Sequence, residues 1–246
     1  MNHYLTVNPI TTSVLHTGDS LEQFVYDHVR GQLVENSILA ITSKLFSVAE
    51  NRRVPHESIS KLDLIKKDCD YFVCDTSHGV ALTIKHGLLI PSSGIDESNS
   101  EGGDYLLFPE KPFESLQKLH RFLAEKTGVK TFGLIMTDSH THALRKGVTG
   151  IALAHWGFQA TRNLVGQEDL FGRKIKMTSV NVVDSLAVSA VLAMGEAAES
   201  RPLAIVQCRD VVFTAPGAVT TADEIRIPLE EDLYGPVLRA LNSKIT

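Results

Sequence analysis

The sequence predicts an α+β protein, on the basis of two observations. Apolar runs of strand length and amphipathic runs of helix length both occur along the 246 residues, but without the strict alternation that a doubly wound parallel sheet requires. Hydrophobic residues make up 43% of the chain and charged residues 22%, which is an ordinary balance for a globular core. Because no internal repeat, low-complexity tract or obvious linker interrupts it, we expect one unit over residues 1–246.

The helix over Pro112–Lys126 has the strongest local signals. Its proline stands at the first helical position, apolar residues recur at helical spacing, and Gly128 follows as a stop. The same spacing predicts further helices over Asp19–Leu33 (with Asp19 or Ser20 as the N-cap), Ser58–Lys67, Val180–Met194 and Glu230–Leu241. The Val180–Met194 helix is apolar on nearly every side, so we expect it to be buried.

Eight short apolar runs have the length and composition of strands. They are Tyr4–Val7, Ile38–Thr42, Tyr71–Cys74, Val80–Ile84, Leu88–Ile90, Phe132–Met136, Ile151–Ala154 and Leu203–Cys208.

The charge and the cysteines exclude several classes of protein. A net charge of −5 argues against broad neutralisation of nucleic-acid phosphates. No apolar run reaches the length of a membrane span, and the first ten residues lack the pattern of a signal peptide. The three cysteines follow no CxxC spacing, which suits reduced thiols. We therefore expect a cytoplasmic protein without a nucleic-acid or membrane partner.

Polar residues follow the ends of four predicted elements. They are Thr42-Ser43-Lys44 after Ile38–Ile41, Asp96 and Asn99 beyond Leu88–Pro91, Asp138 and Ser139 after Phe132–Met136, and Gly195-Glu196 after the Val180–Met194 helix. Carboxylates and hydroxyls suit Mg²⁺ or Mn²⁺, and a lysine beside backbone amides suits phosphate. If these ends converge, they predict a site for nucleotide chemistry. Taken singly, each has an ordinary alternative as a solvated lysine, a turn residue or a helix-end acid.

The stretch Asp138-Ser-His-Thr-His142 also permits a different interpretation. A D-x-H-x-H pattern after an apolar strand is typical of hydrolases that bind metals through imidazoles and acids. Such enzymes need further histidine ligands downstream, and only His155 follows His142 here. The other interpretation of His140 and His142 is that they form hydrogen bonds or contact the substrate without binding a metal.

Many short motifs of the chain occur in the same order as in a known protein family. Among them are Ile41-Thr-Ser-Lys44, His78-Gly79, Gly94-Ile-Asp-Glu-Ser-Asn99-Ser-Glu-Gly102, Leu107-Phe-Pro109, Arg145-Lys-Gly147, Gly166-Gln-Glu-Asp-Leu-Phe-Gly-Arg173 and Met194-Gly195. Together they resemble the gamma-glutamyl ligase of the deazaflavin coenzyme F-420. The match covers about residues 8–208, and the C-terminal extension 209–246 adds nothing to it.

The resemblance implies a fold, a reaction and a set of site residues. The fold would be two intertwined α+β subdomains in a homodimer. The reaction would use GTP and Mg²⁺ or Mn²⁺ to join L-glutamate to a substrate carboxylate through an acyl phosphate. The implied metal ligands are Asp96, Asp138 and Ser139, and the implied catalytic residues are Asp96, Asp138 and Lys44. The implied nucleotide contacts are Asn8, Pro9, Ile10, Thr11, Ser43, Lys44, Asn99, Gly195 and Glu196.

The chain departs from the family pattern after Asp138 and Ser139. His140, Thr141, His142 and Ala143 stand where an aromatic residue, a glycine, an arginine and a proline are usual, whereas Arg145 keeps its place. Histidine lacks both the fork and the permanent charge of arginine. We therefore expect His140, His142 and Arg145 to form an altered pocket for the carboxylate acceptor. A metal-dependent hydrolase and a nucleotide-binding member without ligase activity stay open as alternatives.

Overall fold

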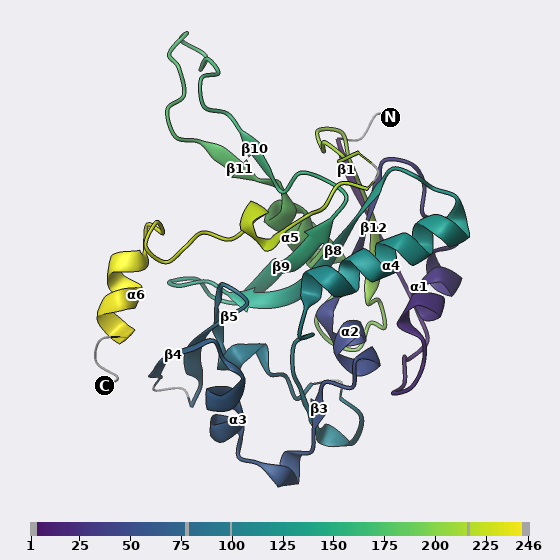
Figure 1. The fold of residues 1–246 in the computed structure, drawn as a ribbon, viewed down its shortest axis with the longest axis vertical. Coiled ribbons are helices and arrows are strands. Elements are labelled where there is room, and N and C mark those ends of the chain that lie inside the picture. The colour runs from purple at the N-terminus through teal and green to yellow at the C-terminus, as the bar shows by residue number, and fades with distance from the viewer. Residues whose placement is uncertain (1–3, 77–78, 99, 216, 243–246) are drawn as a thin grey trace.

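A five-stranded mixed sheet forms the centre of the molecule (Figure 1). The computed structural model describes residues 4–76, 79–98, 100–215 and 217–242. In spatial order the strands are β1 (Leu5–Ile10), β12 (Leu203–Cys208), β2 (Ser37–Thr42), β8 (Phe132–Thr141) and β9 (Val148–Trp156). Only β2 and β8 pair in parallel, whereas the other neighbours are antiparallel. The carboxyl end of β2 therefore lies beside Thr137, in the middle of β8.

Helices cover both faces of this sheet, and β2 shows why. Leu39 and Ile41 point to one face, whereas Ile38 and Ala40 point to the other, and all four are buried; a strand buried on both faces is apolar without alternation. The first face packs against α1 (Leu21–Val29), α2 (Ser43–Ala49) and α4 (Pro112–Thr127). The second face packs against α5 (Val182–Met194), which lies behind the sheet in Figure 1.

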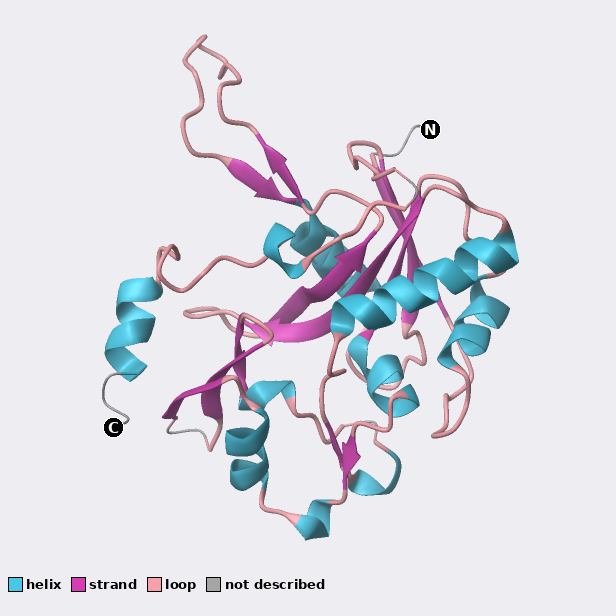
Figure 2. Cartoon of the chain, viewed as in Figure 1, coloured by secondary structure: helices cyan, strands magenta, loops and turns pink. Residues whose placement is uncertain are grey.

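A smaller part of the chain, between α2 and α4, has a core of its own. It contains a three-stranded sheet, a two-stranded sheet and short helices (Figure 2). Its elements are β3 (Arg53–Val54), η1 (His56–Ser58), α3 (Lys61–Asp68), β4 (Tyr71–Asp75), β5 (Ala81–Lys85), β6 (Leu88–Pro91), η2 (Ser92–Gly94), η3 (Glu101–Gly103) and β7 (Tyr105–Leu106). Separate sheets with helices packed on them confirm the predicted α+β class.

Two later segments extend from the main sheet. The hairpin of β10 (Thr161–Asn163) and β11 (Ser179–Asn181) projects away from the body of the molecule (Figure 1). The C-terminal stretch carries η4 (Ala222–Glu224) and α6 (Gly235–Asn242), and α6 packs against β4. Within the described residues, no helix is long and apolar enough to cross a membrane.

The elements with strong local signals are confirmed. Helix α4 begins at Pro112 and ends at Gly128, which has a φ of 75°. Ser20 caps α1 by accepting a hydrogen bond from the backbone N–H of Gln23. The strands predicted at 38–42, 71–74, 80–84, 88–90 and 203–208 are all present within two residues of the expected bounds.

Other predictions need correction. β8 continues through Asp138 to Thr141, because β9 pairs with it along its whole polar half. α5 is not buried on every side, since Leu192 is 84% exposed. The C-terminal helix begins only at Gly235, and the short helix α2 was not predicted. β1 runs on to Ile10, past a proline that an edge strand tolerates.

Candidate active site

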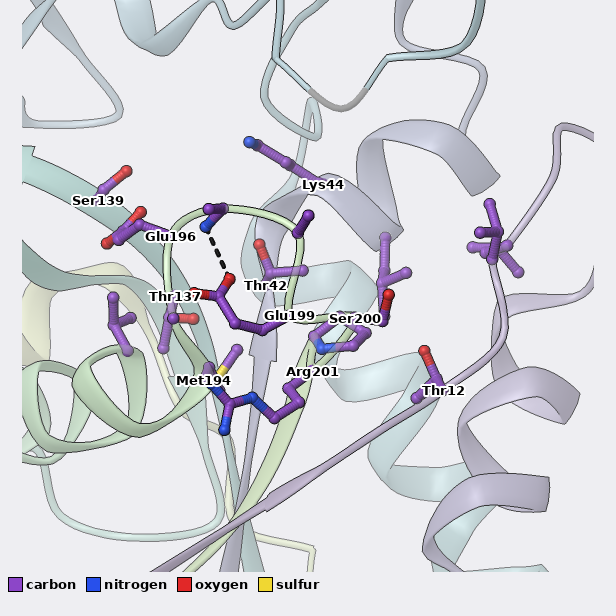
Figure 3. A pocket seen from close by; sticks show the side chains of 18 of the residues that line it. Thr12, Thr42, Lys44, Thr137, Ser139, Met194, Glu196, Glu199, Ser200 and Arg201 are labelled. Carbon is purple, nitrogen blue, oxygen red and sulfur yellow. Dashed lines mark hydrogen bonds between the residues drawn. The ribbon is translucent and has the colours of Figure 1, made fainter.

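A cavity of about 380 Å³ opens at the carboxyl end of β2, beside Thr137, Asp138 and Ser139 of β8 (Figure 3). Five segments line it: the turn after β1, α2 with the residue before it, Leu106 of β7, the middle of β8, and the end of α5 with the loop to β12. Their polar lining residues include Thr12, Thr42, Lys44, Thr137, Asp138, Ser139, Glu196, Glu199, Ser200 and Arg201. The carboxyl ends of parallel strands are a common place for ligands in α/β sheets, and the volume is that of a small-molecule site.

Lys44 joins the main sheet to the smaller part of the chain. Its Nζ lies 2.6 Å from Asp96 Oδ2 and donates a hydrogen bond to Ser98 Oγ at 3.0 Å. The other oxygen of Asp96 accepts hydrogen bonds from the backbone N–H groups of Glu97 and Ser98, both at 2.7 Å. Burial raises the pKa of Asp96, but the hydrogen bonds from Lys44 and Ser98 outweigh it, so the pKa lies below its ordinary value. Asp96 is thus held as an anion beside a cation.

The turn before Asp96 has an unusual backbone that fixes its position. Ser92, Ser93 and Gly94 all have positive φ, at 52°, 58° and 69°, which costs energy for the two serines. A Cβ at Gly94 would lie 2.1 Å from the Phe108 ring. Asp96 then pairs through its backbone with Leu106, which lines the cavity. Asp96 is not among the described residues that line the cavity, but the turn places it against Lys44 and Leu106, which do, and this backbone requires glycine at position 94.

Asp138 is the most perturbed acid at the site. Burial raises the pKa of this carboxyl to about 7, against the attraction of Lys44 and a backbone hydrogen bond at Ser139. The hydroxyl of Ser43, the first residue of α2, lies 3.4 Å from Asp138 Oδ1. These neighbours do not supply enough positive charge to keep a buried carboxylate ionised. A cation bound beside Asp138 would favour its ionised form, which is a property expected of a metal ligand.

Glu196 adds a second acid to the cavity wall. Burial raises its pKa, while the nearby hydroxyl of Ser139 acts in the opposite direction; the two side chains are neighbours in Figure 3. The loop that carries Glu196 is closed by Glu199, whose carboxylate accepts a hydrogen bond from the backbone N–H of Ala197 at 2.8 Å. Gly195 has a φ of 88°, and a Cβ there would meet the Glu199 carboxylate at 2.4 Å.

The donor set fits a hard cation. Asp138, Ser139 and Glu196 offer carboxylate and hydroxyl oxygens on one wall, which are the ligands that Mg²⁺ and Mn²⁺ prefer. Among residues 4–76, 79–98, 100–215 and 217–242, no three His, Cys, Asp or Glu side chains come together as a metal cage. Mg²⁺ commonly binds through one or two carboxylates and completes its shell with substrate phosphates. The site fits that mode better than a cage made entirely of protein ligands.

The two histidines lie beyond the cavity: His140 is near the end of β8, and His142 comes directly after the strand. Their ring centroids are 4.8 Å apart and nearly perpendicular. His142 Nε2 is 2.8 Å from Thr149 Oγ1, and Nδ1 of His140 is buried with no hydrogen-bond partner in the described structure. Arg145 is exposed in the turn after β8. The described residues supply no third ligand that would complete a hydrolase metal centre here.

The remaining predicted residues lie at varied distances from the cavity. Asn8, Pro9 and Ile10 belong to β1, and the cavity is lined by the residues from Thr12 to Leu15 that come shortly after them. Gly195 lines the cavity, and Ser43 lies behind it against Asp138. Asn99 and His78 lie outside the described residues. Sequence reasoning missed Thr12, Glu199 and Arg201, because none of them follows a predicted strand or carries a distinctive motif.

Comparisons with known proteins identify the family of the chain. The family model described as "F420-0:Gamma-glutamyl ligase" matches residues 9–208. A protein of Archaeoglobus fulgidus named "Coenzyme F420:L-glutamate ligase" is 31% identical over 242 residues, 92% of this chain and 94% of its own. Its namesake from Methanopyrus kandleri is 29% identical over 205 residues, 76% of this chain and 80% of its own.

A shorter alignment shows higher identity. The Methanocaldococcus jannaschii protein of the same name is 41% identical over 150 residues, which is 61% of this chain and 58% of that protein. The family match includes α5 and all the residues that line the cavity. The chain belongs to the gamma-glutamyl ligase family of coenzyme F-420.

Proposed function

We propose that this protein is a GTP- and divalent-metal-dependent ligase that joins L-glutamate, or a similar amine, to a carboxylate acceptor. The observation that carries the proposal is the convergence of Lys44, Asp138, Ser139 and Glu196 on one cavity. A cation and three oxygen ligands suit a metal–triphosphate complex, because phosphoryl transfer depends on positioning and charge screening. The ligase activity itself is what the named relatives in this family support.

The reaction needs activation of a carboxylate, and the cavity suits that chemistry. One oxygen of the acceptor carboxylate attacks the γ-phosphorus of GTP, GDP leaves, and an acyl phosphate forms. The amine of glutamate then attacks the acyl carbon, loses a proton and expels phosphate, which leaves an amide. A divalent cation bound at this site would screen the phosphate oxygens. Lys44 would hold the phosphates. Asp138 and Ser139 would hold the cation together with Glu196 or Asp96, of which Glu196 lines the cavity and Asp96 is paired with Lys44.

The first experiment is a calorimetric titration of GTP and ATP in the presence of Mn²⁺. We expect micromolar binding of GTP by the wild type and loss of binding in Asp138→Asn. The matched control is Asp27→Asn, which should bind as the wild type does. Asp27 is an exposed aspartate on α1 whose carboxylate accepts a hydrogen bond from Gln23 of the same helix. Retention of zinc without any nucleotide binding would contradict the proposal and favour the hydrolase alternative.

A turnover assay then separates a ligase from a nucleotide-binding member without catalysis. Glutamate-dependent release of phosphate from GTP, with a carboxylate acceptor present, is the expected result. Nucleotide binding without turnover on any acceptor would leave only the second class of protein.

The altered segment at the end of β8 concerns the choice of the carboxylate acceptor. A histidine pair contacts a carboxylate or phosphate with one hydrogen bond per ring, whereas arginine grips it with two. We propose that His140, His142 and Arg145 give this protein a different acceptor preference from relatives that have arginine. His142→Arg should shift activity towards the deazaflavin acceptor, and Arg145→Gln should weaken acceptor binding. If His142→Arg leaves the ranking of acceptors unchanged, the proposal for this segment is wrong.

We also propose a homodimer, because the resemblance implies one. The exposed apolar residues of the projecting hairpin, such as Leu170 and Phe171 at 99% and 81% exposure, are a candidate contact surface. Light scattering at several concentrations would measure the mass, and a value of one chain throughout would exclude the dimer.

A further inference from the structure

A second cation lines the cavity, and nothing in the family motifs points to it. Among the described residues that line the cavity, the basic side chains are Lys44 and Arg201. Arg201 lies in the loop between α5 and β12, close to Met194 and Glu199 in Figure 3. Its Nε is buried and has no hydrogen-bond partner in the described part of the chain.

A buried donor on a charged group without a partner is expensive to keep. Loss of a hydrogen bond to a charged group costs more than loss of one between neutral groups. Buried polar groups in native proteins are almost always paired, and an exception needs a reason such as a ligand or an ordered water. In the wall of a ligand cavity, an unpaired donor can form its hydrogen bond with the bound ligand.

The charges around Arg201 leave it available for an anion. Lys44, the other cation of the cavity, forms an ion pair with Asp96 and a hydrogen bond with Ser98, so part of its charge is already neutralised. The carboxylate of Glu199 accepts a hydrogen bond from the backbone N–H of Ala197 at 2.8 Å. Backbone hydrogen bonds and, to a lesser degree, the charge of Arg201 hold the pKa of Glu199 below its ordinary value, but the described residues form no hydrogen bond or close ion pair between the two side chains. The planar guanidinium presents its donors as a fork that matches phosphate or carboxylate oxygens in pairs.

The backbone on either side of Arg201 is tied to two other walls of the cavity. The carbonyl of Ser200 accepts a hydrogen bond from the N–H of Thr12 at 2.9 Å, and that of Pro202 accepts one from Thr42 at 3.0 Å. Ser200 has a φ of 55°, and proline fixes its own φ. The stem of Arg201 is therefore anchored at both sides, so a ligand meets a positioned guanidinium.

We propose that Arg201 is an anion-binding residue of this cavity. It takes either a phosphate group of the nucleotide or the carboxylate of the amino-acid donor, both of which are oxyanions. The inference rests on the proposed function for the identity of the anion, whereas the availability of the guanidinium stands on its own geometry.

The test compares Arg201→Gln and Arg201→Lys with Arg209→Gln. Arg209 is an exposed arginine just beyond β12, so its variant removes the same charge from the same end of the chain without touching the cavity. Affinity for GTP and for inorganic tripolyphosphate is measured by calorimetry with Mn²⁺, and KM for glutamate by phosphate release. Thermal unfolding of each variant checks that it folds.

The expected result is a loss of about tenfold or more in one of these quantities for Arg201→Gln. Arg201→Lys should lose less, because it keeps the charge but not the fork. Weaker GTP binding with an unchanged KM for glutamate assigns the anion to the nucleotide, and the reverse assigns it to the donor. If Arg201→Gln changes only the unfolding temperature, an ordered water satisfies the guanidinium and the inference is overturned.

Failure of the proposed function gives a different pattern. A wild type that binds no GTP and ligates nothing refutes the ligase. The role of Arg201 is then tested only by the affinity for tripolyphosphate. If Arg201→Gln binds tripolyphosphate at least about tenfold more weakly than the wild type, the anion site is upheld. Absent or unchanged tripolyphosphate binding overturns it.

Discussion

Replacing Asp138 by asparagine should make the stability of this protein less sensitive to pH. Burial raises the folded-state pKa of Asp138 to about 7, from an ordinary value of 3.8. Because the pKa is raised, the folded state holds a proton that the unfolded state releases, so wild-type stability falls as the pH rises towards 7. Each pKa unit corresponds to about 1.4 kcal/mol, so the wild type loses about 3 kcal/mol from this group between pH 5 and pH 8.

Asparagine has the same shape as aspartate but does not titrate. Its side-chain oxygen still faces the hydroxyl of Ser43, which is 3.4 Å from Asp138 Oδ1 in the wild type. The variant therefore avoids the cost of a buried charge while it keeps the packing. We expect the stability of Asp138→Asn relative to the wild type to improve by about 3 kcal/mol between pH 5 and pH 8.

Urea unfolding of both proteins at pH 5, 6, 7 and 8, with a chelator present, measures this difference. Groups that titrate alike in both proteins cancel in the comparison. Addition of Mn²⁺ at pH 8 should then stabilise the wild type but not the variant, because a bound cation favours the ionised carboxylate. A stability difference that stays constant from pH 5 to pH 8 would refute the reasoning about burial.

Two further predictions concern the rim of the cavity. Gly94→Ala should destabilise the protein by about 3 kcal/mol, because the new Cβ would overlap the Phe108 ring at a φ of 69°; Gly18→Ala, at a φ of 98° with open space around it, should cost about 1 kcal/mol in the same thermal unfolding assay. A similar loss of stability in both variants would show that the Phe108 ring moves aside for the new Cβ. Lys44→Gln should change stability by less than about 1 kcal/mol, since its ion pair is 28% and 37% exposed, yet weaken GTP binding at least about tenfold by calorimetry; unchanged affinity would remove Lys44 from the phosphate site.

Local signals were sufficient wherever the chain itself carries the start and stop of an element. α4 is the clearest case, since Pro112 and Gly128 bound a helix whose apolar spacing needs no tertiary partner to be recognised. β8 is the opposite case. Its residues from Asp138 onwards have the composition of a loop, and only the pairing with β9 makes them a strand. Backbone pairing between distant segments leaves little trace in either sequence.

The same division applies to the site. Lys44 and Asp138 could be predicted because each follows an apolar run of strand length, and polar residues are expected where such a run leaves the core. The polar character of these residues is visible in the sequence, whereas their convergence depends on the parallel pairing of β2 and β8. The motif order then carried the family resemblance across most of the chain.

The sequence by itself determined the fold class, the helices with clear ends and the residues that motif order singles out. Tertiary structure alone decided that Asp138 has a raised pKa, that Gly94 must lack a side chain, and that Arg201 lies in the cavity with a buried, unpartnered Nε. The physical reason is that burial and electrostatic environment are properties of the atoms that surround a residue. Those atoms come from segments far apart in the chain, and only folding brings them together.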